Sequence, residues 1–264
     1  MMRALLIRGM LVGILAGVLA FGVAKIFGEP QVDRAIAFEE QMDAAKAAAE
    51  TQTKESAATN MTMAGGHDMS HADAAEPELV SRTTQAGIGL LTGVVVYGAA
   101  FGGLFAVAFG LVLGRLSRLG PRATAALLAA AAFTTIYFIP SLKYPANPPS
   151  VGLPETIGFR TSLFFVMIAI SIAAMIFAVK LGQWFAEQYG NWNGTLLGAA
   201  AFFAIVVIAQ LALPPLNEVP EGFPADVLWN FRVASTGIQV MMWSTLGIVF
   251  GHLADKLLQK STTS

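Results

Sequence analysis

The chain of 264 residues contains no cysteine, and only 12% of its residues are charged. The lack of cysteine excludes disulfides, iron–sulfur clusters, thiolate zinc sites and cysteine nucleophiles. A soluble domain carries about 25% charged residues, whereas 55% of this chain is hydrophobic and 26 residues are glycine. Glycine is more frequent in membrane helices than in soluble ones. The composition therefore predicts a polytopic membrane protein.

Several signatures of enzymes and of ATP-driven pumps are also missing from the sequence. It has no Walker A pattern, no strand-led GxGxxG, no HExxH and no GxSxG, and no catalytic triad is visible. No soluble region is large enough for an ATPase domain, so active transport would need a gradient or another subunit. We therefore expect no enzyme, no tightly bound cofactor and no nucleic-acid partner; a membrane enzyme acting on lipid would need an acid–base constellation that is missing.

Six apolar runs are long enough to cross a bilayer, which takes roughly 20 residues of helix. They predict one all-α integral-membrane domain with about six transmembrane helices, at residues 4–27, 86–114, 122–140, 160–181, 194–214 and 232–253. The first run begins with basic residues, as a signal peptide does. It is long, however, and lacks a small-x-small exit after Lys25, so we expect a retained anchor.

Basic residues in the short loops predict the orientation, because cytoplasmic loops carry an excess of Lys and Arg. One side holds Arg3, Arg8, Arg115, Arg118, Arg122, Lys180, Lys256 and Lys260, and the short loops of the other side hold only Lys143, Arg160 and Arg232. Both termini are therefore predicted to be cytoplasmic, with the chain in a bacterial inner (plasma) membrane.

One long polar segment, residues 28–85, is predicted to be a periplasmic loop. Residues 29–50 place Val32, Ile36 and Met42 roughly on one helical stripe, so we expect a helix that extends the first span outward. Residues 51–80 are rich in Thr, Ser, Ala, Gly and acids without periodicity, and we expect them to be flexible.

Within that segment, the stretch MTMAGGHDMSH at 61–71 holds two of the three histidines. Imidazole and thioether are soft-to-borderline ligands for transition metals. We therefore predict metal capture by His67 and His71, four residues apart, with Asp68 and the thioethers of Met61, Met63 and Met69. The alternative is a low-complexity linker, because this spacing is less specific than a Cys-pair motif. The third histidine, His252, is more typical of an interfacial side chain.

Two proline-rich segments, 139–165 and 213–237, resemble each other. Each follows a membrane helix, contains several prolines and an acid, and closes with Phe-Arg at Arg160 or Arg232. With a weaker third copy at 27–32 and 81–84, the pattern predicts three repeated helical hairpins, a common way to build transporters. The alternative is ordinary punctuation of membrane helices by Pro and Arg.

Polar residues near these loops and within the spans are candidates for an ion path. Glu155, Glu218 and Glu221 are expected to line an external cation vestibule, or alternatively to form salt bridges with the loop arginines. Gln210 and Gln239 are candidates for ion-coordinating carbonyls within the membrane, although such residues more often hydrogen-bond between helices. The spans hold almost no ionisable groups, so no proton relay is predicted.

Glycines four residues apart mark faces where helices approach closely. These faces comprise Gly9, Gly13 and Gly17 in the first span, and Gly98 with Gly102 and Gly110 with Gly114 in the second. They predict close packing within the bundle or against a partner protein, which includes a homo-oligomer.

The run FGEPQVDRAIAFEEQ at 27–41, directly after the first span, resembles CbtA, a family of proposed cobalt transporter subunits. The His-bearing loop, the proline-rich loops and the length are also similar, so the resemblance covers nearly the whole chain. It implies an inner-membrane protein linked to cobalt supply for cobalamin synthesis, with a small single-span partner, CbtB, that carries its own His-rich segment. It fixes no catalytic residues, and His67 and His71 are its carry-overs for binding.

These patterns together predict the membrane subunit of an uptake system for cobalt or a related divalent transition metal. The metal ion is expected to bind only transiently. The alternative is a structural or assembly subunit of a bacterial inner-membrane complex, which the glycine faces and the lack of an energy module also fit.

Overall fold

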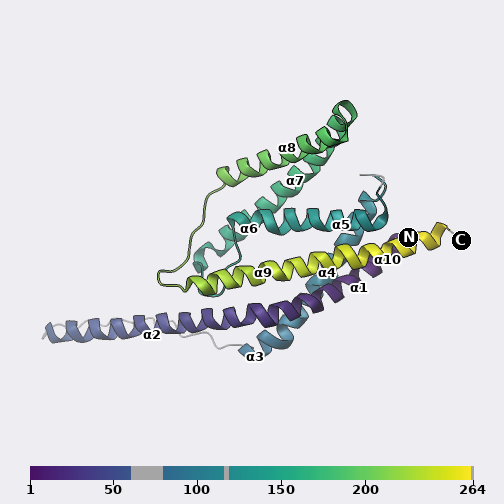
Figure 1. The fold of residues 1–264 in the computed structure, drawn as a ribbon. Helices are drawn as coiled ribbons and strands as arrows, with labels where there is room; N and C mark the ends of the chain where they lie inside the picture. Colours follow the sequence, from purple (N-terminus) through teal and green to yellow (C-terminus); the bar gives the residue numbers. More distant parts are fainter. Residues whose placement is uncertain (61–79, 116–118, 263–264) are drawn as a thin grey trace.

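The computed structural model describes residues 1–60, 80–115 and 119–262, and every regular element in these ranges is helical (Figure 1). Six helices are long and apolar enough to cross a membrane, namely Met2–Thr53, Arg82–Val112, Pro121–Lys143, Pro154–Tyr189, Asn191–Ala212 and Ala225–Lys260. The third and shortest apolar run thus lies in a helix of 23 residues. The prediction of an all-α, multi-pass membrane protein with six candidate spans is confirmed.

The first span continues into the polar segment without a break. Helix α1 (Met2–Val23) passes through a π-helical turn, η1 (Ala24–Gly28), into α2 (Glu29–Asn60), which extends beyond the other helices in Figure 1. The helix therefore extends at least to residue 60, beyond the expected residue 50. Residues 44–50, AAKAAAE, have high helix propensity, and the helix continues from them through residues 51–60 although no apolar stripe is present.

Helices α1 and α4 (Leu90–Val112) pack backbone to backbone. A Cβ atom on Gly13 would lie 2.1 Å from the carbonyl oxygen of Gly98, and one on Gly102 would lie 2.1 Å from that of Gly9. The predicted glycine faces of the first two spans therefore face each other within the bundle. Gly114 serves differently: it adopts a φ of +74° just beyond the end of α4.

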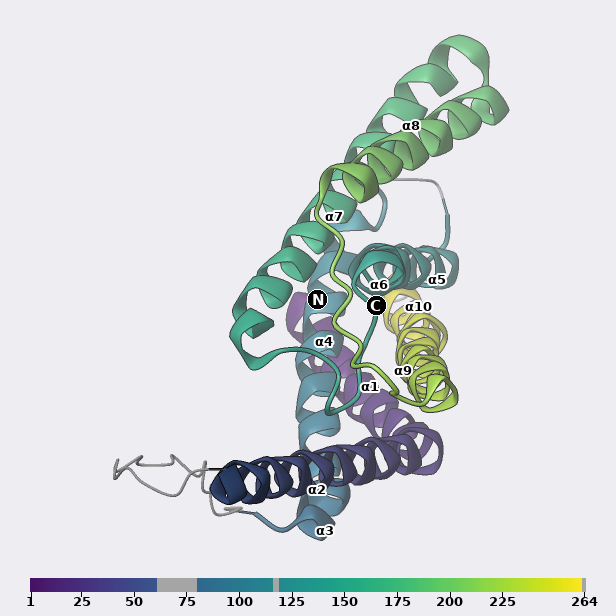
Figure 2. The same ribbon diagram turned by 90° about the vertical axis from the view of Figure 1, so that its left-hand side faces the viewer.

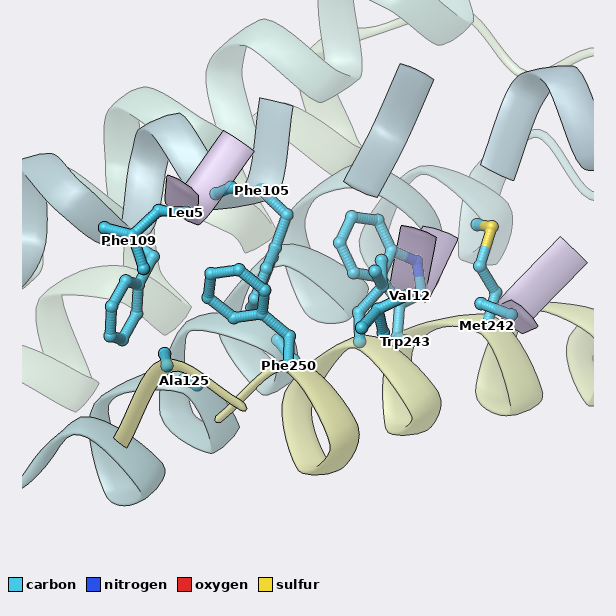
Figure 3. Packing of buried hydrophobic residues seen from close by; sticks show 13 residues of the cluster. Leu5, Val12, Phe105, Phe109, Ala125, Met242, Trp243 and Phe250 are labelled. Atoms are coloured by element: carbon cyan, nitrogen blue, oxygen red, sulfur yellow. The ribbon is translucent and has the colours of Figure 1, made fainter. Parts of the chain in front are cut away.

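The main core joins α1 and α4 to four elements from later in the chain: α5 (Pro121–Ala132), α9 (Ala225–Thr245), η5 (Leu246–Phe250) and α10 (Gly251–Thr262). Figure 3 shows Phe105, Phe109 and Phe250 gathered there, with Trp243 and Val12 farther along the same layer. The rings of Phe109 and Phe250 meet edge to face, with centroids 5.2 Å apart. This core joins the first two spans to the third and the sixth.

The later spans pair differently from the three expected hairpins. Helix α8 (Asn191–Ala212) packs chiefly along α7 (Ile157–Tyr189), as both ribbon views show (Figures 1 and 2). A Cβ on Gly194 would lie 2.5 Å from the carbonyl oxygen of Gly182, so small residues again set the contact. The sixth span lies instead on α1 and α5. The expected third hairpin, made of spans five and six, is therefore wrong as a packed unit, because uniformly apolar faces do not specify a partner.

Candidate site at the junction of two loops

The two similar proline-rich segments meet at the end of the bundle away from both chain termini (Figure 1). The first leaves α6 (Ile139–Lys143) and reaches α7 through a short 3-10 turn, η4 (Pro154–Thr156), and the second links α8 to α9. Between them lies a cavity of about 600 Å³, which we call the loop junction. Its lining residues are Tyr144, Pro145, Asn147, Pro148, Pro149, Val151, Ile157, Arg160, Thr161, Phe164, Leu216, Asn217, Glu218, Val219 and Arg232.

Glu218, from the second loop, contacts the first loop at two points and the start of α7 at a third. Its carboxylate accepts hydrogen bonds from the backbone N–H of Leu153 at 3.0 Å and from the hydroxyl of Thr156 at 2.8 Å. The same Oε2 atom lies 3.4 Å from Nε of Arg160. The bond from Leu153, then that from Thr156, and the charge of Arg160 together hold the pKa of Glu218 below the ordinary value for glutamate. This carboxylate therefore stays ionised in the loop junction at neutral pH.

Arg232, at the start of the sixth span, makes the opposite connection. Its Nε donates to the carbonyl oxygen of Ala146 at 3.3 Å, and its Nη2 donates to Oδ1 of Asn147 at 3.0 Å. The hydroxyl of Tyr144 donates to the carbonyl oxygen of Pro214 at 2.9 Å. Each segment thus contributes an arginine that contacts the other one.

The first loop takes up an uncommon backbone shape to reach this arrangement. Gly152 has a φ of +118°, and a Cβ there would lie 2.0 Å from Nη1 of Arg160. Only glycine leaves room for the guanidinium at this φ. Ser150, with a φ of 70°, donates to the carbonyl oxygen of Ala35 at 2.9 Å and contacts Oε2 of Glu39 at 3.1 Å. The loop is therefore attached to α2 as well.

The three carboxylates that the sequence suggested for a vestibule do not lie together. Glu218 lines the cavity, where it forms the salt bridge that was the alternative interpretation. Glu155 and Glu221 are both exposed and are not among the lining residues. The structure therefore brings one of the three acids, and both loop arginines, to the loop junction.

The two candidate glutamines also lie in different surroundings. The side-chain amide of Gln210 donates to the carbonyl oxygen of Ile139 at 3.1 Å, and the backbone carbonyl of Gln210 accepts a bond from Lys143 Nζ. Gln210 thus links α8 to α6. Gln239 lines a separate cavity of about 350 Å³ with residues of α1 and α4, including Tyr97.

Metal capture was predicted for His67, Asp68, Met69, His71, Met61 and Met63, and all six lie outside the described residues. Within the ranges that the structure describes, no group of three or more His, Asp or Glu side chains could hold a metal ion. His252 is exposed on α10 (Gly251–Thr262), and the neighbouring Asp255 pairs with Arg122 at 2.8 Å.

A family model described as "Probable cobalt transporter subunit (CbtA)" matches residues 2–255. The chain belongs to the CbtA family. The match covers the first five candidate spans, most of the sixth and both loops of the loop junction. No curated protein and no solved structure matches the chain. By its family, the protein is a probable cobalt transporter subunit, as the resemblance implied.

The run at 27–41 that resembles CbtA lies where the base of α2 contacts the second span. Arg82, which the sequence placed only in a weak third repeat, binds Glu29 at 2.6 Å and Asp33 at 3.0 Å. Lys25 donates to the carbonyl oxygen of Ala86 at 3.1 Å. The four-residue spacing of Glu29 and Asp33 on one helical face was a signal for this cluster. In this chain, the block fixes the base of α2 to the second span.

The same block also meets the two loops. Phe38 packs edge to face on Phe223 of the second loop, with ring centroids 5.1 Å apart. Ala35 is fully buried beside Val151 and Phe223. The most specific part of the resemblance therefore coincides with the residues that join α2 to the loop junction of this CbtA chain.

Proposed function

We propose that this CbtA chain is the membrane subunit of an uptake system for cobalt, or a related divalent transition metal, linked to cobalamin supply. The family match over residues 2–255 carries the proposal. Six candidate spans support a subunit within the bilayer, and the lack of a nucleotide-binding motif supports an energy source elsewhere. The metal is a transported substrate in this proposal, and the chain catalyses no reaction on it.

The proposed orientation places both termini in the cytoplasm of a bacterium and the loop junction on the periplasmic side. Both termini lie at one end of the bundle, and the loops lie at the other (Figure 1). The excess of Lys and Arg near the end with the termini supports this orientation.

The first step of uptake is capture of the metal by the polar segment after α2. Imidazoles of His67 and His71, with Asp68 and the thioether of Met69, raise the local metal concentration at the periplasmic face. Replacement of both histidines by alanine should lower cobalt uptake at limiting cobalt and leave it unchanged at saturating cobalt. His252→Ala is the matched control. Equal uptake by the double variant and the control would reduce the segment to a linker.

The later steps involve the other predicted residues. Glu155 and Glu221, both exposed near the loops, are proposed to attract the metal at the periplasmic surface. Gln210 and Gln239 are proposed to lie along the path, which requires Gln210 to release the carbonyl oxygen of Ile139. A small single-span CbtB-like subunit with its own His-rich segment is the proposed partner.

A second candidate function is a structural or assembly subunit of an inner-membrane complex. The engaged side chains of Gln210 and Glu218 favour it, because residues that hold loops and helices together are less available to an ion. Co-purification separates the two functions. Recovery with a small His-rich single-span protein supports transport, and stoichiometric recovery with a large enzyme complex supports assembly.

Growth of a deletion strain in medium with limiting cobalt tests the proposal as a whole. The strain should grow poorly when growth depends on cobalamin synthesis, and added cobalt or added cobalamin should each restore growth. Rescue by neither compound would contradict a role in cobalt supply.

A further inference from the structure

The loop junction carries an unusual balance of charge for a protein that handles a cation. Its lining includes two guanidinium groups, those of Arg160 and Arg232, and one carboxylate, that of Glu218. Glu218 is already bound by Leu153, Thr156 and Arg160. The surplus charge of the lining is therefore positive, and it disfavours a bare divalent cation there.

Both arginines keep N–H donors that the described residues do not use. A guanidinium has five such donors. Arg160 donates one, from Nη1 to the carbonyl oxygen of Val151 at 3.5 Å, and its buried Nε faces Oε2 of Glu218 at 3.4 Å as an ion pair without a hydrogen bond. Arg232 uses Nε and Nη2 for the first loop. Nη2 of Arg160 and Nη1 of Arg232 remain available, on two side chains that line one cavity.

The remainder of the lining is suited to an organic molecule. Three prolines, Pro145, Pro148 and Pro149, give rigid walls, and the rings of Tyr144 and Phe164 add apolar surface. The cavity of about 600 Å³ falls within the range of small-molecule sites, which are mostly apolar with a few placed polar groups. Arginine suits planar carboxylate and phosphate oxygens because its donors form a fixed fork.

We propose that the loop junction is a binding site for a carboxylate or phosphate oxyanion, held between Arg160 and Arg232. The site goes beyond the proposed capture of a metal, and it does not require that the protein transport cobalt. Because Arg160 on α7 and Arg232 on α9 each follow one loop and contact the other loop, a bound oxyanion would also stabilise the joined state of the two loops. The oxyanion is either that of a water-soluble molecule or the headgroup of an anionic lipid.

Three single variants of the full-length chain test the site. Arg232→Gln removes one positive charge and should weaken oxyanion binding roughly tenfold or more, the scale of a charge-assisted hydrogen bond. Glu218→Gln keeps the size of the side chain and removes the competing negative charge, so it should tighten binding. Arg34→Gln is the matched control, because Arg34 makes an exposed ion pair with Asp226 at 3.5 Å and is not among the residues that line the cavity.

Two probes distinguish the source of the oxyanion. Radiolabelled inorganic phosphate and citrate are titrated into the protein purified in detergent, and in parallel the protein is placed in nanodiscs of phosphatidylcholine with or without phosphatidylglycerol. Retention of phosphatidylglycerol is then measured by mass spectrometry of the complex. Saturable binding of phosphate or citrate identifies a soluble ligand, and selective retention of phosphatidylglycerol alone identifies a headgroup.

The first two variants are expected to change probe binding in opposite directions, which distinguishes a binding site from a purely structural junction. Either probe should bind more weakly to Arg232→Gln, more tightly to Glu218→Gln, and equally to Arg34→Gln and the wild type. If Arg232→Gln does not fold, the gain in Glu218→Gln decides the question alone. Failure of every probe to bind, or weaker binding to Glu218→Gln, overturns the proposal; neither result affects the cobalt dependence of growth, which tests the proposed function.

Discussion

The guanidinium of Arg160 lies 3.4 Å from the carboxylate of Glu218, which belongs to the other of two similar loops. Arg232 returns the contact by donating to Ala146 and Asn147 of the first loop. The two loops are therefore held together as one unit, because a residue of each segment contacts the other segment. Through Ser150, this unit is also fixed to the base of α2, at Ala35 and Glu39. A substitution that breaks any one of these contacts should therefore also disturb the other contacts of this unit.

The acid sensitivity of the loop junction follows from Glu218. The pKa of its carboxyl group is held below the ordinary value by hydrogen bonds from Leu153 and Thr156 and by Arg160. A lowered pKa stabilises the fold above the pKa of the unfolded chain, about 4.3, and the contribution is lost as the pH falls through the lower folded value. The melting temperature of the wild type should exceed that of Glu218→Gln equally at pH 7 and pH 5.5, and the difference should shrink only below about pH 4. A difference that already shrinks between pH 7 and 5.5 would contradict this account.

The contact between α1 and α4 predicts a strong position dependence of glycine substitutions. Gly13→Ala places a methyl group 2.1 Å from the carbonyl oxygen of Gly98, so the helices must separate. We expect a loss of about 1–3 kcal/mol in the free energy of unfolding, as for other overpacked sites. Gly22→Ala, in the same helix, meets nothing within 4 Å and should be neutral or stabilising. Unfolding in mixed detergent micelles, followed by circular dichroism, measures both; equal losses would show that the helices do not touch at Gly13.

Gly152 predicts a second effect of an added methyl group. With a φ of +118° and with Arg160 Nη1 only 2.0 Å from the added Cβ, Gly152→Ala must move the arginine or the loop. The amide of Leu153, which donates to Glu218, should then exchange its hydrogen roughly tenfold faster. Gly158→Ala is the control, since Gly158 lies in α7 with nothing within 4 Å. Hydrogen exchange detected by mass spectrometry gives both rates, and unchanged exchange in Gly152→Ala would place Arg160 away from the loop.

The lack of cysteine makes the proposed orientation directly measurable. Glu155 precedes α7 and Glu187 lies near its other end, and both side chains are exposed. In intact spheroplasts, a membrane-impermeant thiol reagent should label Glu155→Cys and leave Glu187→Cys unlabelled until the membrane is opened. The cysteine-free wild type is the blank. The reverse pattern would place both termini in the periplasm.

The number of candidate spans and the presence of close-packing glycine faces could be predicted from the sequence, whereas the partner of each face could not. Apolar runs of sufficient length indicate membrane helices because the bilayer thickness sets the length. The spacing of Gly9, Gly13 and Gly17 indicated a close approach, and the structure supplies Gly98 and Gly102 as the partners. The contact of α8 with α7 has the same signal in Gly194 and Gly198, but nothing in the sequence says which helix meets that face.

The loop junction was visible in the sequence only as a repeat. Arg160 and Arg232 stood out because each closes a similar loop, and a salt bridge to a loop acid was one of two interpretations. That each arginine contacts the opposite loop depends on how α7 and α9 are placed in the bundle, and on the positive φ of Gly152. Such contacts between distant segments are not encoded in local spacing. The Met/His segment lies outside the described residues, so its role remains a prediction.

The initial rate of radioactive cobalt uptake at limiting cobalt tests the central claim most directly. Deletion cells carrying an empty vector are compared with cells that express the tagged wild-type chain, with equal growth and with the amount of protein in the membrane fraction measured. The account predicts that the wild-type chain restores a saturable uptake that the deletion cells lack. Equal rates in both cells, with the protein present in the membrane, would contradict a role in cobalt transport.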